Sequence, residues 1–322
     1  MMVSVGQVLV TGATGFVGGA LVKRLAGECL AGGVVASLRR QGVALPEGVR
    51  PVQVGDLLPS TDWSTALQDV EVVVHSAARV HVMQDDVGNP LEVYRQVNVQ
   101  GTLNLARQAA QAGVRRFVFV SSIKVNGEAT LLGRPFKADD PPAPEDAYGV
   151  SKAEAEAGLL QMANETGMEV VIIRPPLVYG PGAKGNFSSL LRWITCGLPL
   201  PLGGSIANRR SLVALDNLVD LILTCVQHPK AANQTFLVSD GEDLSTTELL
   251  QKMGNAMNRP ARLLPVPLGL LTFAARLLGK TAVAERLVGS LQVDISKTCE
   301  LLDWKPPVSV DEELRRVVQK RL

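Results

Sequence analysis

The chain is poor in the residues that usually hold metals, form disulfides or contact nucleic acids. Its 322 residues include four cysteines and three histidines, and no two cysteines form a Cys-x-x-Cys pair. This spacing indicates neither a zinc site nor a disulfide framework. The 32 lysines and arginines balance the 31 aspartates and glutamates, and no run of like charges marks a nucleic-acid surface. We therefore expect reduced thiols, a cytoplasmic location, no bound metal, no nucleic acid and a small-molecule partner.

Long hydrophobic runs are missing too. The first residues lack the basic flank, apolar core and cleavage site of a signal peptide, so we expect no export. The most apolar later segment, Leu268 to Ala284, is interrupted by Arg276 and Lys280, and it is shorter than the roughly 20 residues of a membrane span. We expect no stable membrane insertion. A buried or substrate-capping helix is favoured there over a helix on a membrane surface.

The first half of the chain alternates short β-branched runs with longer helical patterns. The runs are almost continuously apolar, as in parallel strands that helices cover on both faces. This pattern predicts an α/β fold, a doubly wound parallel sheet of the Rossmann type with a smaller C-terminal substrate lobe. The expected strands are Gln7–Thr11, Val34–Leu38, Glu71–His75, Arg116–Val120 and Glu169–Ile173, and the expected helices are Phe16–Ala26, Leu91–Ala112 and Ala147–Glu165.

Clusters of proline and glycine after residue 175 indicate a change of organisation. We predict a dinucleotide-binding domain over residues 1–175 and a mainly substrate-binding lobe over residues 176–322. Residues 211–240 are expected to return to the first domain, with a helix at Asp216–Gln227 and a strand at Gln234–Ser239. In doubly wound sheets ligands bind outside the carboxyl ends of the strands, so the site residues should follow those ends.

A glycine-rich turn joins the first expected strand to the first expected helix. It has the pattern Gly-x-x-Gly-x-x-Gly, in which glycines let the backbone approach a pyrophosphate at a helix N-terminus. A purely structural turn is the alternative. The cofactor-binding residues predicted here are Gly12, Thr14, Gly15, Phe16, Val17 and Gly18.

The end of the second strand bears on the choice between NAD and NADP. An acidic residue there would bind the free ribose 2′-hydroxyl of NAD, whereas this chain has Arg39 and Arg40. Guanidinium groups pair well with a 2′-phosphate. The sequence therefore favours NADP, with NAD as the alternative. Asp56 and Leu57, after the third short strand, are candidates for holding the adenine edge.

Three polar residues form a candidate catalytic group. Tyr148 and Lys152 lie four apart on an expected helix and share one face. A nearby ammonium group can lower the pKa of a tyrosine phenol, which otherwise titrates near ~10. Ser122 follows the strand Arg116–Val120, where its hydroxyl can bond a substrate oxygen. We predict that these three residues are catalytic.

With these motifs the chain resembles the extended short-chain dehydrogenases/reductases that act on nucleotide sugars. The resemblance covers nearly the whole chain and rests on Thr11–Gly18, His75–Ala78, Asn98–Thr102, Ser121–Ser122, Tyr148–Lys152, Arg174–Pro175, Val178–Pro181, Asp294–Lys297 and Leu302–Pro306. It implies that Tyr148 transfers a proton, that Ser122 binds the reacting oxygen and that Lys152 also holds the nicotinamide ribose. Further contacts are implied with the cofactor for Ala77, Ala78 and Pro175, and with the substrate for Asn98, Asn186 and Arg210. Lys124 departs from the small residue that is common there in epimerases, and it is a candidate substrate contact with a surface lysine as the alternative.

The same resemblance implies a UDP-sugar substrate and a homodimer formed by the helices at Asn98–Ala112 and Tyr148–Glu165. Ile123 and Lys124 stand where 4,6-dehydratases have an Asp-Glu pair, which argues against dehydration. The arginine pair favours an NADPH-dependent 4-keto-reductase over an epimerase. The segment Ser121–Glu128 also resembles a branch of the family that includes such reductases. That resemblance implies a UDP-4-keto-6-deoxy-N-acetylhexosamine substrate and a role in bacterial O-antigen synthesis. The alternatives are an NAD-dependent UDP-hexose or UDP-N-acetylhexosamine 4-epimerase, and a non-catalytic cofactor-sensing protein.

Overall fold

The computed structural model describes residues 5–28, 32–80, 90–183, 186–277 and 287–319. Its largest element is a seven-stranded sheet made of β1 (Gln7–Thr11), β2 (Val34–Leu38), β3 (Val49–Gln53), β4 (Val70–His75), β5 (Arg116–Val120), β6 (Glu169–Arg174) and β9 (Gln234–Leu237). The strand order is β3-β2-β1-β4-β5-β6-β9, and neighbouring strands are parallel. The order reverses beside β1, so the predicted doubly wound α/β fold is confirmed.

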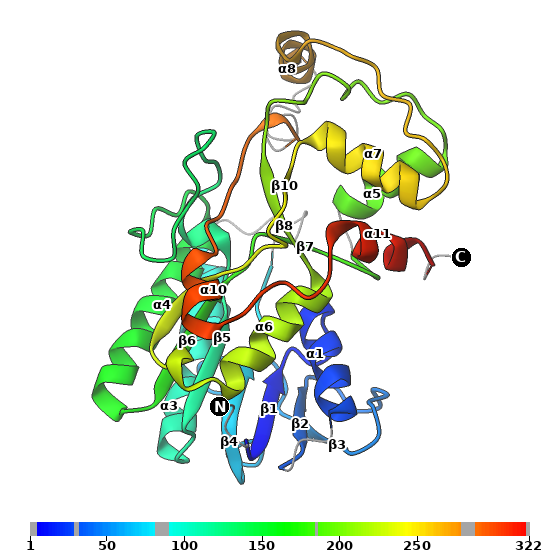
Figure 1. Cartoon of the computed structure of the whole chain (residues 1–322). Coiled ribbons are helices and arrows are strands. Elements are labelled where there is room, and N and C mark those ends of the chain that lie inside the picture. Colours follow the sequence, from blue (N-terminus) through cyan, green and yellow to red (C-terminus); the bar gives the residue numbers. More distant parts are fainter. Residues whose placement is uncertain (1–4, 29–31, 81–89, 184–185, 278–286, 320–322) are drawn as a thin grey trace.

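Helices cover both faces of this sheet because its strands are apolar on both sides (Figure 1). On one face α1 (Phe16–Gly27) and α6 (Leu215–Gln227) enclose a hydrophobic core, and α10 (Ser296–Leu302) closes its edge. On the other face α3 (Thr102–Gln111) and α4 (Ala147–Thr166) enclose a second core. The short turns η2 (Ile123–Val125) and η3 (Pro229–Ala231) complete the connections.

The predicted helix Leu91–Ala112 has an irregular middle. It consists of α2 (Pro90–Tyr94), the π-helical segment η1 (Arg95–Gly101) and α3. A side chain at Gly101 would place its Cβ only 2.9 Å from the carbonyl oxygen of Leu57, so glycine lets this segment approach the loop after β3 closely. Single π-helical turns within α-helices often lie at functional sites, and this one carries Asn98.

The smaller lobe has its own sheet and core. Its strands are β7 (Leu177–Tyr179), β8 (Arg210–Ala214) and β10 (Asp243–Leu244), with β8 in the centre. The helices α5 (Asn186–Thr195), α7 (Thr246–Ala256) and α11 (Val310–Gln319) pack into a third hydrophobic core. Of residues 211–240, α6 and β9 lie with the large sheet, whereas most of the segment before α6 forms β8 of the small sheet.

The segment α8 (Leu268–Leu277) lies at the far end of the smaller lobe (Figure 1). The expectation of a buried helix is wrong here, because Leu270, Phe273 and Leu277 are 59%, 60% and 74% exposed. Among the side chains of α8 that the structure describes, the half-buried Leu271 packs against the third core. Within the described ranges, no helix is both long and apolar enough to span a bilayer.

Candidate active site

A cavity of about 620 Å³ opens at the carboxyl ends of β1, β2, β3 and β4. Its walls come from short segments that follow these strands: Thr11–Gly15, Ser37–Arg39, Val54–Leu58 and Ser76–Val80. Eight of the predicted cofactor residues meet here, namely Gly12, Thr14, Gly15, Arg39, Asp56, Leu57, Ala77 and Ala78. Phe16, Val17 and Gly18 form the first turn of α1 beside the cavity.

Two glycines make this cavity possible. Gly12 has a φ of +67°, and a Cβ on it would lie 2.9 Å from the amide nitrogen of Ala77. A Cβ on Gly18 would lie 2.2 Å from the carbonyl oxygen of Gly12. The first turn of α1 contains no acidic residue, so its free N–H groups and positive dipole end suit a diphosphate. The open turn therefore fits a dinucleotide.

The arginines at the end of β2 lie differently from what the sequence suggested. The Arg39 guanidinium lines the cavity but has the Asp56 carboxylate 3.8 Å away, and both side chains are exposed. Arg40 is exposed and is not among the residues that line the cavity. A carboxylate beside Arg39 repels a phosphate, so Asp56 weakens the case for a 2′-phosphate at Arg39.

A second cavity, of about 440 Å³, lies between the large sheet and the smaller lobe. Ser122 and Tyr148 line it together with Lys124, Pro175 and Arg210. Ser122 caps η2, and its hydroxyl oxygen accepts a hydrogen bond of 3.3 Å from the backbone N–H of Lys124. Asp146 caps α4 through the N–H of Gly149, at 2.7 Å, and so fixes the helix turn that carries Tyr148.

Lys152 lies beneath this cavity rather than in its wall. Its side chain is 1% exposed, and Nζ donates a 2.9 Å hydrogen bond to the carbonyl oxygen of Val120 and lies 4.0 Å from the Phe119 ring centre. Burial lowers the pKa of Lys152 to about 7. Burial and the Asp146 carboxylate raise the pKa of Tyr148, opposite to the expected lowering, because the ammonium bonds a carbonyl oxygen instead of the phenol.

The candidate substrate residues Arg210, Asn98 and Asn186 lie in three different environments. Arg210 lines the second cavity and donates a 3.2 Å hydrogen bond to the carbonyl oxygen of Gly289. Asn98 is buried, accepts a hydrogen bond from the Arg79 N–H at 2.8 Å and donates to Ser151 Oγ at 3.0 Å. Asn98 thus joins η1 to α4. Asn186 begins α5, and its side chain lies outside the described residues.

Lys124 has two carboxylate partners at the cavity wall. Its Nζ donates to Glu128 at 2.8 Å and to Asp146. Burial lowers the pKa of Lys124, but the hydrogen bonds to Asp146 and Glu128 outweigh burial and raise the pKa overall. The ammonium is therefore charged, and its position is fixed close to Ser122 and Tyr148.

A buried ionic network behind Ser122, Tyr148 and Lys152 was not predicted from the sequence. Glu156 accepts hydrogen bonds from the guanidinium of Arg174, the shortest at 2.6 Å, and from Ser121 Oγ. Arg174 also donates to Asn126 at 3.0 Å. Glu156 follows Lys152 by one helical turn, and this spacing was the available signal. The network joins α4 to the ends of β5 and β6.

His75 was noted only as part of a motif. It is fully buried, with Thr11 Oγ1 2.7 Å from Nδ1 and Thr102 Oγ1 2.9 Å from Nε2. Burial, together with the charge of Lys152, lowers the pKa of His75 to about 3. The ring is therefore neutral and braces the cofactor turn, and it offers no proton for catalysis.

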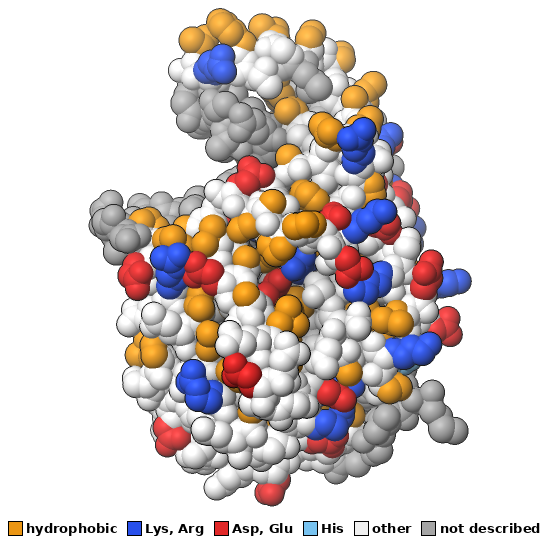
Figure 2. All heavy atoms as spheres, turned by 90° about the vertical axis from the view of Figure 1, so that its left-hand side faces the viewer, with side chains coloured by type: hydrophobic (Ala, Val, Ile, Leu, Met, Phe, Trp, Pro, Cys, Tyr) orange, Lys and Arg blue, Asp and Glu red, His pale blue; other side chains and the backbone are white. Residues whose placement is uncertain are grey.

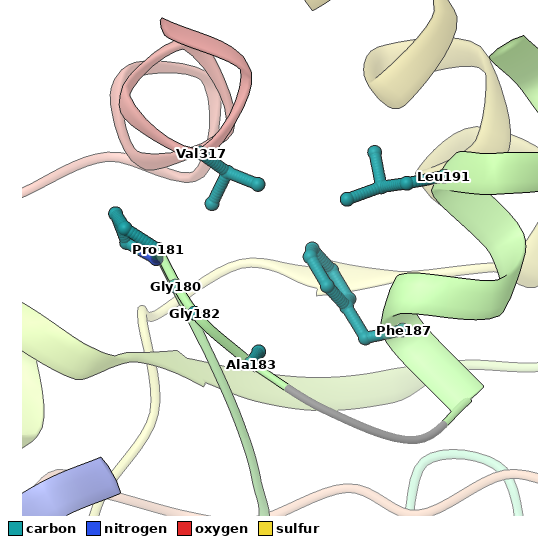
Figure 3. A pocket seen from close by; sticks show the side chains of 7 residues that line it. All are labelled: Gly180, Pro181, Gly182, Ala183, Phe187, Leu191 and Val317. Atoms are coloured by element: carbon teal, nitrogen blue, oxygen red, sulfur yellow. The ribbon is translucent and has the colours of Figure 1, made fainter. Parts of the chain in front are cut away.

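A third cavity, of about 380 Å³, lies beside the second one (Figure 3). Pro181, Phe187, Leu191 and Val317 surround it, from the loop after β7, from α5 and from α11. Phe187 lines the second cavity as well, so its ring separates the two spaces. Within the described residues, no cluster of histidine, cysteine, aspartate and glutamate could hold a metal ion.

Comparison with known proteins agrees with this geometry. The profile of the NAD dependent epimerase/dehydratase family matches residues 8–239. The chain belongs to this family. A UDP-glucose 4-epimerase from Vibrio cholerae is 52% identical over 313 residues, which cover 97% of this chain and 94% of that protein.

Two further proteins are similar to this chain over most of their length. The N-acetyl-α-D-glucosaminyl-diphospho-ditrans,octacis-undecaprenol 4-epimerase of Escherichia coli O157:H7 is 31% identical, over 89% of this chain and 84% of that protein. The solved structure of MoeE5 in complex with UDP-glucuronic acid and NAD has a TM-score of 0.77 and 26% identity, and covers 98% of this chain and 99% of that one.

These findings correct the activity expected from the sequence. The prediction of an NADPH-dependent 4-keto-reductase is wrong, because the relative that shares half of its residues with this chain is a 4-epimerase. Reductases and epimerases share the Ser-Tyr-Lys group, so the choice depended on Arg39 and Arg40 and on the resemblance of Ser121–Glu128. Asp56 beside Arg39 weakens the first argument.

Proposed function

We propose that the protein is a UDP-hexose 4-epimerase that works with a tightly bound NAD. The observation that carries the proposal is the 52% identity with the Vibrio cholerae UDP-glucose 4-epimerase over 97% of the chain. The Escherichia coli relative is also named for inversion at C4 of a diphosphate-linked sugar. Ser122 and Tyr148 share one cavity, which supports proton exchange at a single sugar oxygen.

Epimerisation oxidises C4 of the sugar and then reduces it from the opposite face. When bound, the nicotinamide supplies a hydride acceptor that later returns the same hydride. Tyr148 takes the proton of the 4-hydroxyl and gives it back to the 4-oxygen, while the Ser122 hydroxyl donates a hydrogen bond to that oxygen. Lys152 adds positive charge on the same helix face as Tyr148. That charge would favour the phenolate form only after the ammonium group turns from the carbonyl oxygen of Val120 toward the phenol.

The substrate diphosphate suits the cationic side of the second cavity. Arg210 supplies a guanidinium group there, and guanidinium groups bind phosphate oxygens in a bidentate manner. The adjoining wall contains Leu177, Leu212 and Leu291. Leucine side chains form no hydrogen bonds with the sugar, so the sugar can present either face to this wall without losing any.

NAD fits the proposal better than NADP. In an epimerase the cofactor is regenerated in each turnover, so no separate NADPH supply is needed. The Asp56 carboxylate near Arg39 disfavours a 2′-phosphate at the mouth of the cofactor cavity. The complex of MoeE5 contains NAD together with a UDP-sugar, which supports the same pairing.

The test is to purify the protein without added cofactor and to follow UDP-glucose, UDP-galactose and UDP-N-acetylglucosamine by proton NMR. We expect interconversion at C4 without added nicotinamide, and NAD in the supernatant of the denatured protein by mass spectrometry. Conversion that requires added NADPH and stops when it is consumed would reject the proposal. Conversion or non-conversion of UDP-N-acetylglucosamine in the same assay tells whether N-acetylated hexoses are substrates.

We also propose a homodimer through the outer faces of α3 and α4. The two helices pack tightly on each other, because a Cβ on Gly158 would lie 2.8 Å from the Leu103 methyl groups. Leu160 on α4 is 39% exposed, as expected for an apolar residue that a second chain covers. Light scattering during size-exclusion chromatography should give twice the chain mass of 34.3 kDa; a single chain mass would refute the dimer.

A further inference from the structure

The outer surface of the smaller lobe carries an apolar patch that the catalytic site does not use. It consists of Leu264, Leu270, Phe273, Arg276 and Leu277, and is called here the α8 patch. Leu264 is 49% exposed, and the three apolar residues of α8 are still more exposed. Figure 2 shows apolar side chains gathered at this far end of the lobe. None of these residues lines the cofactor or substrate cavity.

The exposed residues lie on one side of the helix. Positions 270, 273 and 277 are spaced by three and four residues, so their side chains point in one direction. In α11 the arrangement is the usual one, in which Leu314 and Val317 are buried and Glu312 is exposed. The helix α8 therefore exposes to solvent an apolar face of the kind that α11 buries in the core.

The charge of the surrounding sequence has one sign. From Arg259 to Leu277 the chain has three basic residues and no acidic residue, although the whole protein has a net charge of +1. Arg262 and Arg276 are exposed. No ion pair joins either of them to a carboxylate in the part of the chain that the structure describes. This end of the molecule is therefore both apolar and cationic.

An anionic phospholipid surface matches both properties. Leucine and phenylalanine side chains enter the boundary between headgroups and acyl chains, and arginine side chains reach the phosphate level. A second copy of this chain would carry the same positive charge and would repel it. The proposed dimer helices α3 and α4 lie toward the opposite end of the molecule (Figure 1), so both contacts can form together.

We propose that the α8 patch docks reversibly on the surface of an anionic lipid bilayer. The helix lies in the plane of the headgroups and does not span the membrane. A patch of three large apolar side chains with flanking arginines gives weak binding that depends on charge and salt. The proposal does not depend on the epimerase activity, because the docking is measured on the protein itself.

The test is sedimentation of the full chain with lipid vesicles. One set contains phosphatidylglycerol and phosphatidylethanolamine in equal parts, and the other contains phosphatidylcholine alone. We expect at least roughly tenfold stronger binding to the anionic vesicles and a marked loss in high salt. Equal or absent binding to the anionic set would overturn the proposal.

A triple variant, Leu270→Ser with Phe273→Ser and Leu277→Ser, addresses the patch directly. It should lose about tenfold or more of the vesicle binding while keeping the thermal melting temperature of the native chain. The matched control is Leu131→Ser with Leu132→Ser, which changes two leucines that are 69% and 62% exposed outside the patch and should bind as the native chain does.

Two further outcomes would also overturn the proposal. One is undiminished vesicle binding by the folded triple variant. The other is a native chain that ignores vesicles but has a larger mass in light scattering than the triple variant, which would make the α8 patch a contact between copies. In both cases the fold control is the melting temperature, which does not depend on catalysis.

Discussion

The candidate cofactor cavity and the candidate substrate cavity are lined by different parts of the chain. Four short segments that directly follow strands of one sheet form much of the first, with glycine, alanine, serine and threonine at many positions, and Trp63 and Gln96 are among the larger side chains that complete it. Side chains from Ser122 to Leu291 form the second, from both lobes. A wall made of one local turn can be predicted from sequence, whereas a wall assembled from distant segments depends on how the lobes pack.

The electrostatics of the two cavities differ in the same way. The cofactor turn is neutral and offers helix dipole and N–H groups. The substrate cavity contains charged groups that compensate each other, with Lys124 held between Glu128 and Asp146. Substitutions should therefore affect the first cavity through shape and the second through proton transfer and charge.

The largest effect is expected for Tyr148→Phe. The variant lacks the phenolic proton at the substrate oxygen, so turnover should fall by roughly a thousandfold. Because Tyr148 does not line the cofactor cavity, the released cofactor measured by mass spectrometry should stay unchanged. Turnover within about twofold of the native rate would contradict the proton-transfer role.

A large loss of stability is expected for Glu156→Gln. The variant leaves the Arg174 guanidinium, 6% exposed, without its carboxylate, and breaking a buried pair costs on the order of 3 kcal/mol of unfolding free energy. Urea unfolding gives this value. The matched control is Glu154→Gln, which removes the partly exposed partner of Arg95 and should cost less than about 1 kcal/mol. Equal losses would show that burial does not decide the effect.

The third prediction concerns Glu313 of α11. Its carboxylate is fully buried, and no hydrogen-bond partner reaches either oxygen among the described residues. Burial, helped by the nearby Asp216, raises its pKa from 4.5 to about 7. The folded state thus holds a proton that the unfolded state releases, and this contribution to stability is lost as the pH rises from 4.5 through 7.

Glu313→Gln should remove that pH dependence. The variant should be more stable than the native chain at pH 8, by on the order of 2 kcal/mol, and about equally stable below pH 4.5, the unfolded value. The control Glu312→Gln, on the exposed side of α11, should leave the profile unchanged. A native unfolding free energy that does not fall across this pH range would refute the buried-carboxylate account.

The smallest effect is expected for Arg39→Ser. Because Arg39 forms only an exposed, 3.8 Å ion pair with Asp56, its removal should change the affinity for NADH by less than about threefold. Fluorescence titration measures this affinity. A native chain that binds NADPH much more tightly than NADH, with the preference lost in the variant, would restore the 2′-phosphate interpretation of Arg39.

The large sheet could be predicted because its information is local. Apolar runs placed β1, β2 and β5 at their observed bounds, and the glycine spacing located the cofactor turn. The π-helical turn at Asn98 could not be predicted, because it depends on the approach of Gly101 to Leu57 across the fold. The exposure of Phe273 could not be predicted either, since an apolar sequence does not state which neighbours will cover it.

The catalytic group shows the same division. Ser122, Tyr148 and Lys152 were predicted from strand ends, helix spacing and the family resemblance, and their catalytic roles stay predictions. The direction of the Tyr148 pKa shift could not be predicted from the sequence. It depends on the Lys152 ammonium, which donates its hydrogen bond to the carbonyl oxygen of Val120 and not to the phenol. The choice between reduction and epimerisation depended in part on Arg39, and its partner Asp56 is 17 positions away in the sequence.

The most direct test of the account uses UDP-glucose that carries deuterium at C4 of the sugar. The purified protein is incubated with it in the absence of added cofactor, and the product is examined by NMR and mass spectrometry. The account predicts UDP-galactose that keeps the deuterium at C4, because the transferred hydride returns to the same carbon. Product with ordinary hydrogen at C4, or no product until NADPH is added, would contradict it.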